Sequence, residues 1–121
     1  MANPAQHHKI TYVEFTTTSI EQTKNFYSTV FGWTFKEWGP DYIDSNAASS
    51  GVAIGFARGE ALPALPKSAP LVVLYSSELE VTELAIVAAG GSIVVPTFPF
   101  PGGRRFHFSD GAGNVLGVWS E

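Results

Sequence analysis

The chain has 121 residues, with 7 basic and 11 acidic side chains and a formal net charge of −4. This length fits one domain, and a hydrophobic content of 45% supplies a packed core, which excludes disorder as the main state. The absence of cysteine excludes disulfides, thiolate metal sites and a cysteine nucleophile. The basic residues are dispersed, so we expect no nucleic-acid partner. There is no membrane-length apolar run or signal-peptide layout, so we expect no membrane association and a cytoplasmic location.

The first half of the chain opens with an extended run and continues into a helix. Alternating apolar, β-branched and aromatic residues predict a strand over 10–15. A capping box formed by Thr18 and Glu21 predicts the start of a helix, and apolar residues at spacings of three and four extend it to Gly32. Glycine tolerates the left-handed exit of a helix, so the helix should end there. Three short strands are then predicted, over 33–38, 42–45 and 51–57.

The second half repeats this plan after a proline-rich stretch. A strand is predicted over 71–75, a capping box at Ser77 and Glu80, and a helix that ends at the glycine pair 90–91. Three further strands are predicted over 92–95, 104–108 and 114–119.

The two halves are related by an offset of 59 residues. This offset brings Val13 onto Val72 and Gly32 onto Gly91, and it aligns the predicted strands and helices. Each half is therefore a βαβββ module, with a sheet face that it cannot cover alone. We predict a single α+β domain over 1–121, in which two tandem modules form a cupped eight-stranded mixed sheet with the helices on its outer face. The predicted boundaries are module one over 9–57, a linker over 58–70 and module two over 71–120.

Four sequence motifs resemble one family. They are YVEF at 12–15, NFYSTVFGW at 25–33, AAGGSIVVP at 88–96 and DGAGNVLGVW at 110–119. On these motifs the sequence resembles the glyoxalase/bleomycin-resistance/extradiol-dioxygenase family, also called the vicinal oxygen chelate superfamily. The resemblance extends over residues 10–119 and implies a cup-shaped cavity between the modules, a small-molecule ligand and a homodimer. In enzymes of this family a divalent metal in the cup acts as a Lewis acid.

The positions to which the resemblance assigns metal ligands lack suitable side chains. The first-strand positions hold Tyr12 and Leu71, and the closing-strand position holds Gly117. The strand over 51–57 contains no His, Asp, Glu or Gln. Leucine and glycine side chains cannot coordinate a divalent ion. We therefore predict no cofactor, with a divalent metal only if atypical ligands hold it, and we expect Gly117 to leave space on the cup floor.

Strand alternation and the resemblance together predict the residues that face the cup: Tyr12, Glu14, Arg105, His107 and Trp119. An unperturbed imidazole titrates near neutral pH, so His107 suits proton transfer or an anionic ligand, although a hydrogen-bonded structural histidine fits equally. Glu14 fits a general base, and it also fits a structural ion pair for which Arg105 is the plausible partner. Tyr12 and Trp119 fit either a cavity lining or an ordinary core.

Three functional hypotheses remain open on the sequence alone. The first is a glyoxalase/bleomycin-resistance-like protein that binds a small organic molecule without the usual metal. The second is a lyase-, isomerase- or dioxygenase-like enzyme that uses Glu14 and His107, or an atypical metal site. The third is an interaction subunit with a vestigial cup. The loop over 98–103 is predicted to be a lid, a subunit contact or a turn whose two phenylalanines cover the sheet edge.

Overall fold

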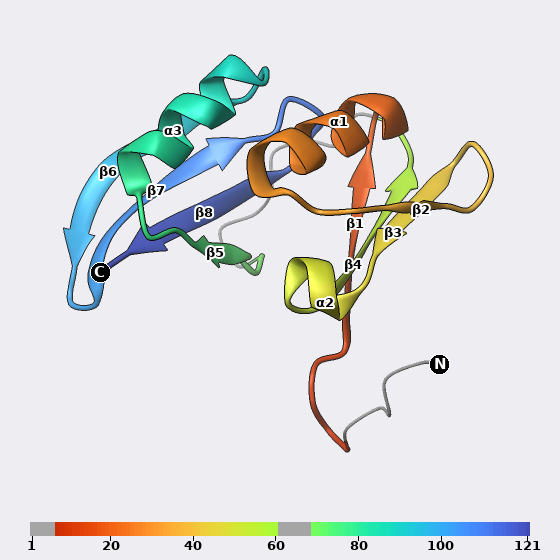
Figure 1. The fold of residues 1–121 in the computed structure, drawn as a ribbon, viewed down its shortest axis with the longest axis horizontal. Coiled ribbons are helices and arrows are strands. Elements are labelled where there is room, and N and C mark those ends of the chain that lie inside the picture. Colours follow the sequence, from red (N-terminus) through yellow and green to blue (C-terminus); the bar gives the residue numbers. More distant parts are fainter. Residues whose placement is uncertain (1–6, 61–68) are drawn as a thin grey trace.

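The computed structural model describes residues 7–60 and 69–121 and contains two similar halves that lie side by side (Figure 1). Module one comprises β1 (Tyr12–Thr17), α1 (Ile20–Phe31), β2 (Lys36–Glu37), β3 (Tyr42–Ser45), α2 (Ala47–Ser50) and β4 (Ala53–Arg58). Module two comprises β5 (Val73–Tyr75), α3 (Leu79–Ala88), β6 (Ser92–Phe100), β7 (Gly103–Ser109) and β8 (Val115–Ser120).

The two modules share one sheet topology. The strand order is β1-β4-β3-β2 in the first sheet and β5-β8-β7-β6 in the second, so the first strand of each module pairs in parallel with the last. The other strand pairs are antiparallel. The predicted α+β class with two βαβββ modules is confirmed. The eight strands form two four-stranded sheets rather than one continuous ladder in the described part of the chain. The predicted linker falls largely on 61–68, outside the described residues.

The helix starts differ from the capping boxes that the sequence predicted. In α1 the cap is Ser19, whose hydroxyl accepts a hydrogen bond from the Gln22 amide at 3.2 Å. The Thr18 hydroxyl instead donates to the carbonyl of Ala112 in module two, at 3.4 Å. Helix α3 has no side-chain cap, so the second predicted box was also wrong. The predicted end of α1 at Gly32 is confirmed, with a left-handed φ of 73°.

Two strand predictions also need correction. The strand predicted over 33–38 shrinks to Lys36–Glu37, because Trp33 turns into the core and stacks on Tyr27 at 5.0 Å. The strand predicted over 92–95 extends to Phe100. This extension is possible because β6 is an edge strand, where prolines remove no ladder hydrogen bond. The short helix α2, which Asn46 caps, was not predicted.

Helix α1 joins the two modules through a shared aromatic core. Phe26 stacks on Phe108 of module two with ring centres 6.0 Å apart, and Tyr27 contacts Phe56 of module one at 5.1 Å. The Tyr27 hydroxyl donates to the buried carboxylate of Asp110 at 2.9 Å. Burial, and then the Asp110 charge, raise the pKa of Tyr27, so this phenol stays a donor. No helix in the two described ranges has the length and apolarity to cross a membrane.

Candidate functional site

The second sheet turns one face toward α3 and leaves the other open. Phe106 and Phe108 point into the core, as predicted, and are fully buried. Arg105 and His107 alternate with them and therefore lie on the open face. The strand register places Arg105 directly opposite Trp119 of β8, and His107 opposite Gly117. We call this surface the module-two face; it carries three of the five predicted site residues.

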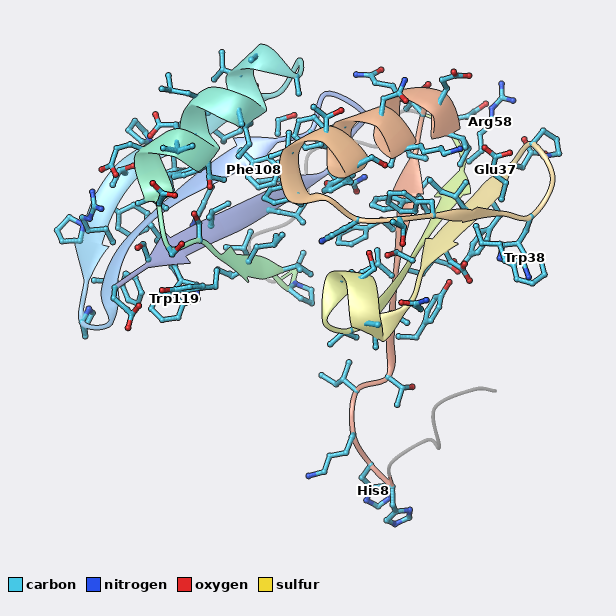
Figure 2. The ribbon with its side chains drawn as sticks, in the orientation of Figure 1. His8, Glu37, Trp38, Arg58, Phe108 and Trp119 are labelled. Atoms are coloured by element: carbon cyan, nitrogen blue, oxygen red, sulfur yellow. The ribbon has the colours of Figure 1, made fainter. Side chains whose placement is uncertain are left out.

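A cavity of about 310 Å³ opens on the module-two face beside the hairpin of β6 and β7. Figure 2 labels Trp119, one of its lining residues. The cavity is lined by Val73, Phe100, Gly102, Arg105, Trp119 and Glu121.

Two aromatic rings of β6 hold the guanidinium of Arg105. Its central carbon lies 5.2 Å from the ring centre of Phe98 and 5.4 Å from that of Phe100, which are cation–π distances. Phe100 also meets the Trp119 ring edge-on at 6.2 Å. The segment predicted as a loop over 98–103 is thus the end of a strand and a tight turn, and its two phenylalanines lie against site residues.

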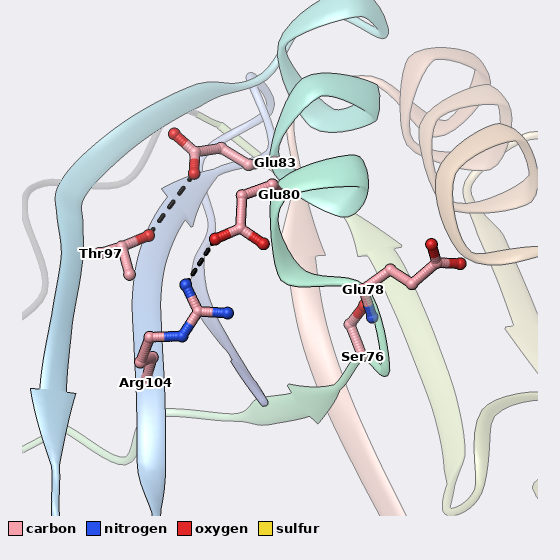
Figure 3. A network of polar contacts seen from close by, with 6 residues as sticks. All are labelled: Ser76, Glu78, Glu80, Glu83, Thr97 and Arg104. Carbon is pink, nitrogen blue, oxygen red and sulfur yellow. Dashed lines mark hydrogen bonds and ion pairs between the residues drawn. The ribbon is translucent and has the colours of Figure 1, made fainter. Parts of the chain in front are cut away.

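The neighbouring arginines of β7 have opposite surroundings. Figure 3 shows Arg104 reaching Glu80 of α3, and this ion pair raises the pKa of Arg104 and lowers that of Glu80. Arg105 points to the other face. Within residues 7–60 and 69–121 it forms no ion pair with a carboxylate. The predicted pairing of Arg105 with Glu14 was therefore wrong, since Glu14 is bound by Tyr42.

Two buried nitrogens of the module-two face lack hydrogen-bond partners among the described residues. They are Nε of Arg105 and Nε2 of His107. Burial, and then the positive charge of Arg105, lower the pKa of His107, so the imidazole is neutral at pH 7. A buried donor without a partner costs about 1–3 kcal/mol, which a ligand that supplies an acceptor recovers.

The expected space at Gly117 is already filled. A Cβ atom built on this glycine lies 3.3 Å from Cδ2 of His107 and 3.4 Å from Cδ2 of Leu71. These distances are tight for a single methyl group, and a larger side chain would displace the imidazole. The prediction of open space on the cup floor was therefore wrong.

The open face of the first sheet carries the other two predicted site residues. The hydroxyl of Tyr42 on β3 donates to Oε1 of Glu14 at 3.0 Å and is also hydrogen-bonded to the hydroxyl of Tyr12. Burial, and then the hydrogen bonds to Tyr12 and Glu14, raise the pKa of Tyr42. Both hydroxyls lie over Gly55 of β4, where a Cβ atom would overlap them. We call this surface the module-one face.

The structure divides the predicted site residues into two clusters. Tyr12 and Glu14 are joined by Tyr42, whereas Arg105, His107 and Trp119 share the rings of β6. On the sequence Tyr42 was only a weaker candidate for the cavity lining, and Phe98 and Phe100 were placed in the loop over 98–103. Glu121 was not predicted as a site residue. Only the pairing register identifies these four residues, because each reaches the site from a neighbouring strand or from the chain beyond it.

Comparison with known proteins decides the family. A model described as "Glyoxalase/Bleomycin resistance protein/Dioxygenase superfamily" matches residues 9–118. The chain belongs to this superfamily. No curated protein sequence matches it significantly.

Several solved structures share the fold of this chain. A family enzyme from Burkholderia phytofirmans PsJN has a TM-score of 0.73 at 17% identity, covering 90% of this chain and 95% of its own. TioX from Micromonospora sp. ML1 has a TM-score of 0.68 at 21% identity, with coverages of 93% and 98%. A variant of the fosfomycin resistance protein FosX from Listeria monocytogenes, complexed with Mn(II) and 1S,2S-dihydroxypropylphosphonic acid, has a TM-score of 0.79 at 15% identity, with coverages of 95% and 91%. At these identities the likeness shows the fold alone.

The divalent metal that the superfamily implies does not fit the residues present here. Gly55 contributes no donor on β4, and the hydroxyls of two tyrosines occupy the space above it. At the equivalent place in module two, Gly117 is packed against His107 and Leu71. In the ranges that the structure describes, no three His, Asp or Glu side chains are grouped closely enough to hold an ion. The carboxylate and imidazole ligands that divalent ions prefer are therefore not brought together in the described part of the chain.

Proposed function

We propose that the protein binds a small organic anion with a planar apolar part in the module-two cavity, without a catalytic metal. The observation that carries this proposal is the guanidinium of Arg105, which borders an aromatic cavity and forms no ion pair with a described carboxylate. The role of such binding is sequestration, carriage or sensing of the ligand.

The cavity has two charged groups in its lining, Arg105 and Glu121. The Glu121 carboxylate accepts a hydrogen bond from the Tyr75 hydroxyl, whereas the Arg105 guanidinium has no described carboxylate partner and favours an acid over a neutral ligand. Guanidinium groups bind carboxylates and phosphonates through two parallel hydrogen bonds. Nε of Arg105 is a buried donor without a hydrogen-bond partner among the described residues, so a ligand acid could accept from it. The rings of Phe100 and Trp119 offer a surface for the planar part of the ligand. A volume of about 310 Å³ suits a small molecule of one or two rings. The ligand in the FosX structure is also an organic acid.

Calorimetry with matched probes tests the proposal. Phenylacetate and phenylphosphonate should bind, and the neutral benzyl alcohol should bind at least about tenfold more weakly. The Arg105→Gln variant should lose a similar factor for the acids. Arg104→Gln is the matched control. It removes the same charge from the residue before Arg105, whose side chain lies on the opposite face of the sheet and pairs with Glu80. Equal affinities for acids and alcohol, or equal losses in the two variants, would overturn the proposal.

The enzyme hypothesis has no specific observation in its favour. In its first form it uses Glu14 and His107 on one ligand, yet the described contacts of Glu14 run to Tyr42 and those of His107 to Phe98. In its second form it uses an atypical metal site, and no three His, Asp or Glu side chains are grouped for one among the described residues. We expect the acid probes to bind without being converted. NMR spectra of the probes, recorded during incubation with the protein, check this.

We also propose that the protein is a homodimer, as the resemblance implied. Large apolar side chains are exposed on β5, where Tyr75 is 52% exposed, and just before β1, where Ile10 is 77% exposed. Contiguous exposed apolar surface is typical of subunit contacts. Light scattering should give twice the chain mass at micromolar concentration, and the mass of one chain at every concentration would contradict the dimer.

A further inference from the structure

We infer that the module-one face holds a second, separate binding site for a protonated amine, formed by Tyr12, Tyr42 and Glu14 above Gly55. This site is independent of the proposed anion site, because it lies on the other sheet and uses none of its residues.

The glycine on β4 creates the site. Gly55 lies between Glu14 of β1 and Asp44 of β3, which are its direct register partners. Tyr12 and Tyr42 reach over it from the two flanking strands and meet above it, in space that any side chain at position 55 would fill. The cluster is therefore fixed by the sheet on its inner side and open to solvent on its outer side, where Tyr12 is 42% exposed.

The direction of the hydrogen bonds decides what the cluster offers to a ligand. A carboxylate only accepts, so the one proton of the Tyr42 hydroxyl goes to Glu14. Tyr42 has no second proton, so Tyr12 must donate its own to the oxygen of Tyr42. The oxygen of Tyr12 and the second carboxylate oxygen of Glu14 are then left with lone pairs and no proton. Toward solvent the cluster presents acceptors only.

An acceptor-only cluster with one negative charge and two phenol rings matches an ammonium group. An ammonium donates up to three hydrogen bonds, pairs with a carboxylate and is attracted to aromatic ring faces. In the described part of the chain Glu14 forms no ion pair with a basic residue, so its charge is available. A carboxylate ligand would meet only acceptors and a like charge, and is excluded by the same arrangement.

Two probes with the same ring and opposite charge separate the two sites. The full-length protein, labelled with ¹⁵N, is titrated with 2-phenylethylammonium and, separately, with phenylacetate. The ammonium should shift amides of β1, β3 and β4 around Gly55, and Tyr42→Phe and Glu14→Gln should each weaken its binding by about tenfold. Glu21→Gln is the matched control, since it removes the same charge from the exposed first turn of α1.

The outcomes distinguish this site from the anion site. Failure of phenylacetate to shift β7 and β8 would count against the proposed function and leave the amine site standing. The amine site is overturned if 2-phenylethylammonium shifts no amide near Gly55. It is also overturned if Glu14→Gln binds the amine as tightly as the wild type, or if Glu21→Gln weakens binding as much as Glu14→Gln. Amide spectra of the variants that match the wild type away from the substitution show that each variant is folded.

Discussion

The two modules share one strand order but have different side chains around the equivalent glycine of the closing strand. The offset of 59 residues brings Glu14 onto Val73, and their parallel partners on the closing strands are Gly55 and Gly117. In module one the glycine lies under two phenols and a carboxylate. In module two its counterpart lies beside an imidazole and a leucine, next to an arginine that forms no ion pair in the described chain.

This comparison shows which part of the sequence sets the fold and which sets the chemistry. The inward strand residues are apolar in both modules and include Phe56 in module one and Phe108 in module two, whose rings pack against α1. The outward residues that alternate with them point away from this shared core, so they can differ between the modules. A duplicated fold therefore gives two open faces whose polarity is independent.

The largest expected effect is the loss of the core that the modules share. Phe108→Ala removes a fully buried ring that stacks on Phe26 and should cost about 3–5 kcal/mol. Both modules should unfold in one transition. Urea unfolding monitored by tryptophan fluorescence and by far-ultraviolet circular dichroism measures this. The exposed Val94→Ala is the control and should change stability little. Separate transitions for the two probes would show that the modules are not one cooperative unit.

The second prediction compares the two equivalent glycines. Gly55→Ala forces a methyl group into the tyrosine hydroxyls and should cost about 1–3 kcal/mol. Gly117→Ala should cost less, because its nearest neighbour lies at 3.3 Å and is the edge of a side chain. Urea denaturation of both variants measures the difference. A larger loss of stability for Gly117→Ala than for Gly55→Ala would contradict the proposed difference between the two faces.

A third prediction concerns the polar tie between the modules. Tyr27→Phe removes the phenol that donates to buried Asp110 and should cost about 1–3 kcal/mol. Tyr75→Phe removes a hydroxyl that donates to Glu121 at an exposed position and should cost much less. Equal losses of stability in the two variants, measured by thermal unfolding, would mean that the buried hydrogen bond from Tyr27 to Asp110 stabilises the fold no more than an exposed one.

The smallest expected effect is a pH dependence that belongs to module two. Because the pKa of His107 is lowered in the folded state, the unfolded chain takes up this proton first as the pH falls. The contribution of His107 is therefore intact above about pH 6.5 and is lost as the pH falls toward the folded pKa. His107→Gln should flatten the stability profile in this range, as measured by urea unfolding between neutral and mildly acidic pH. Parallel profiles for the two proteins would contradict the shift.

The sequence predicted the fold in detail but the site only in part. Repeated strands, helices and glycine stops are local patterns, and Gly32 and the buried phenylalanines of β7 were placed correctly from them. The contacts of Tyr42 with Glu14 and of Phe98 and Phe100 with Arg105 were not predicted, because strand register joins residues that are distant in the chain. The extension of β6 through its prolines was missed for a similar reason, since only its place at the sheet edge permits it.

Metal content tests the central claim, that ligand recognition here does not use the metal site of the superfamily. The untagged protein is produced with nickel, zinc, iron and manganese supplied, and the ions per chain are counted after gel filtration. The account predicts less than about a tenth of an ion per chain, because no three His, Asp or Glu side chains are grouped closely enough to hold an ion in residues 7–60 and 69–121. A stoichiometric ion that EDTA removes would contradict it and would make Glu14 and His107 the first ligands to test.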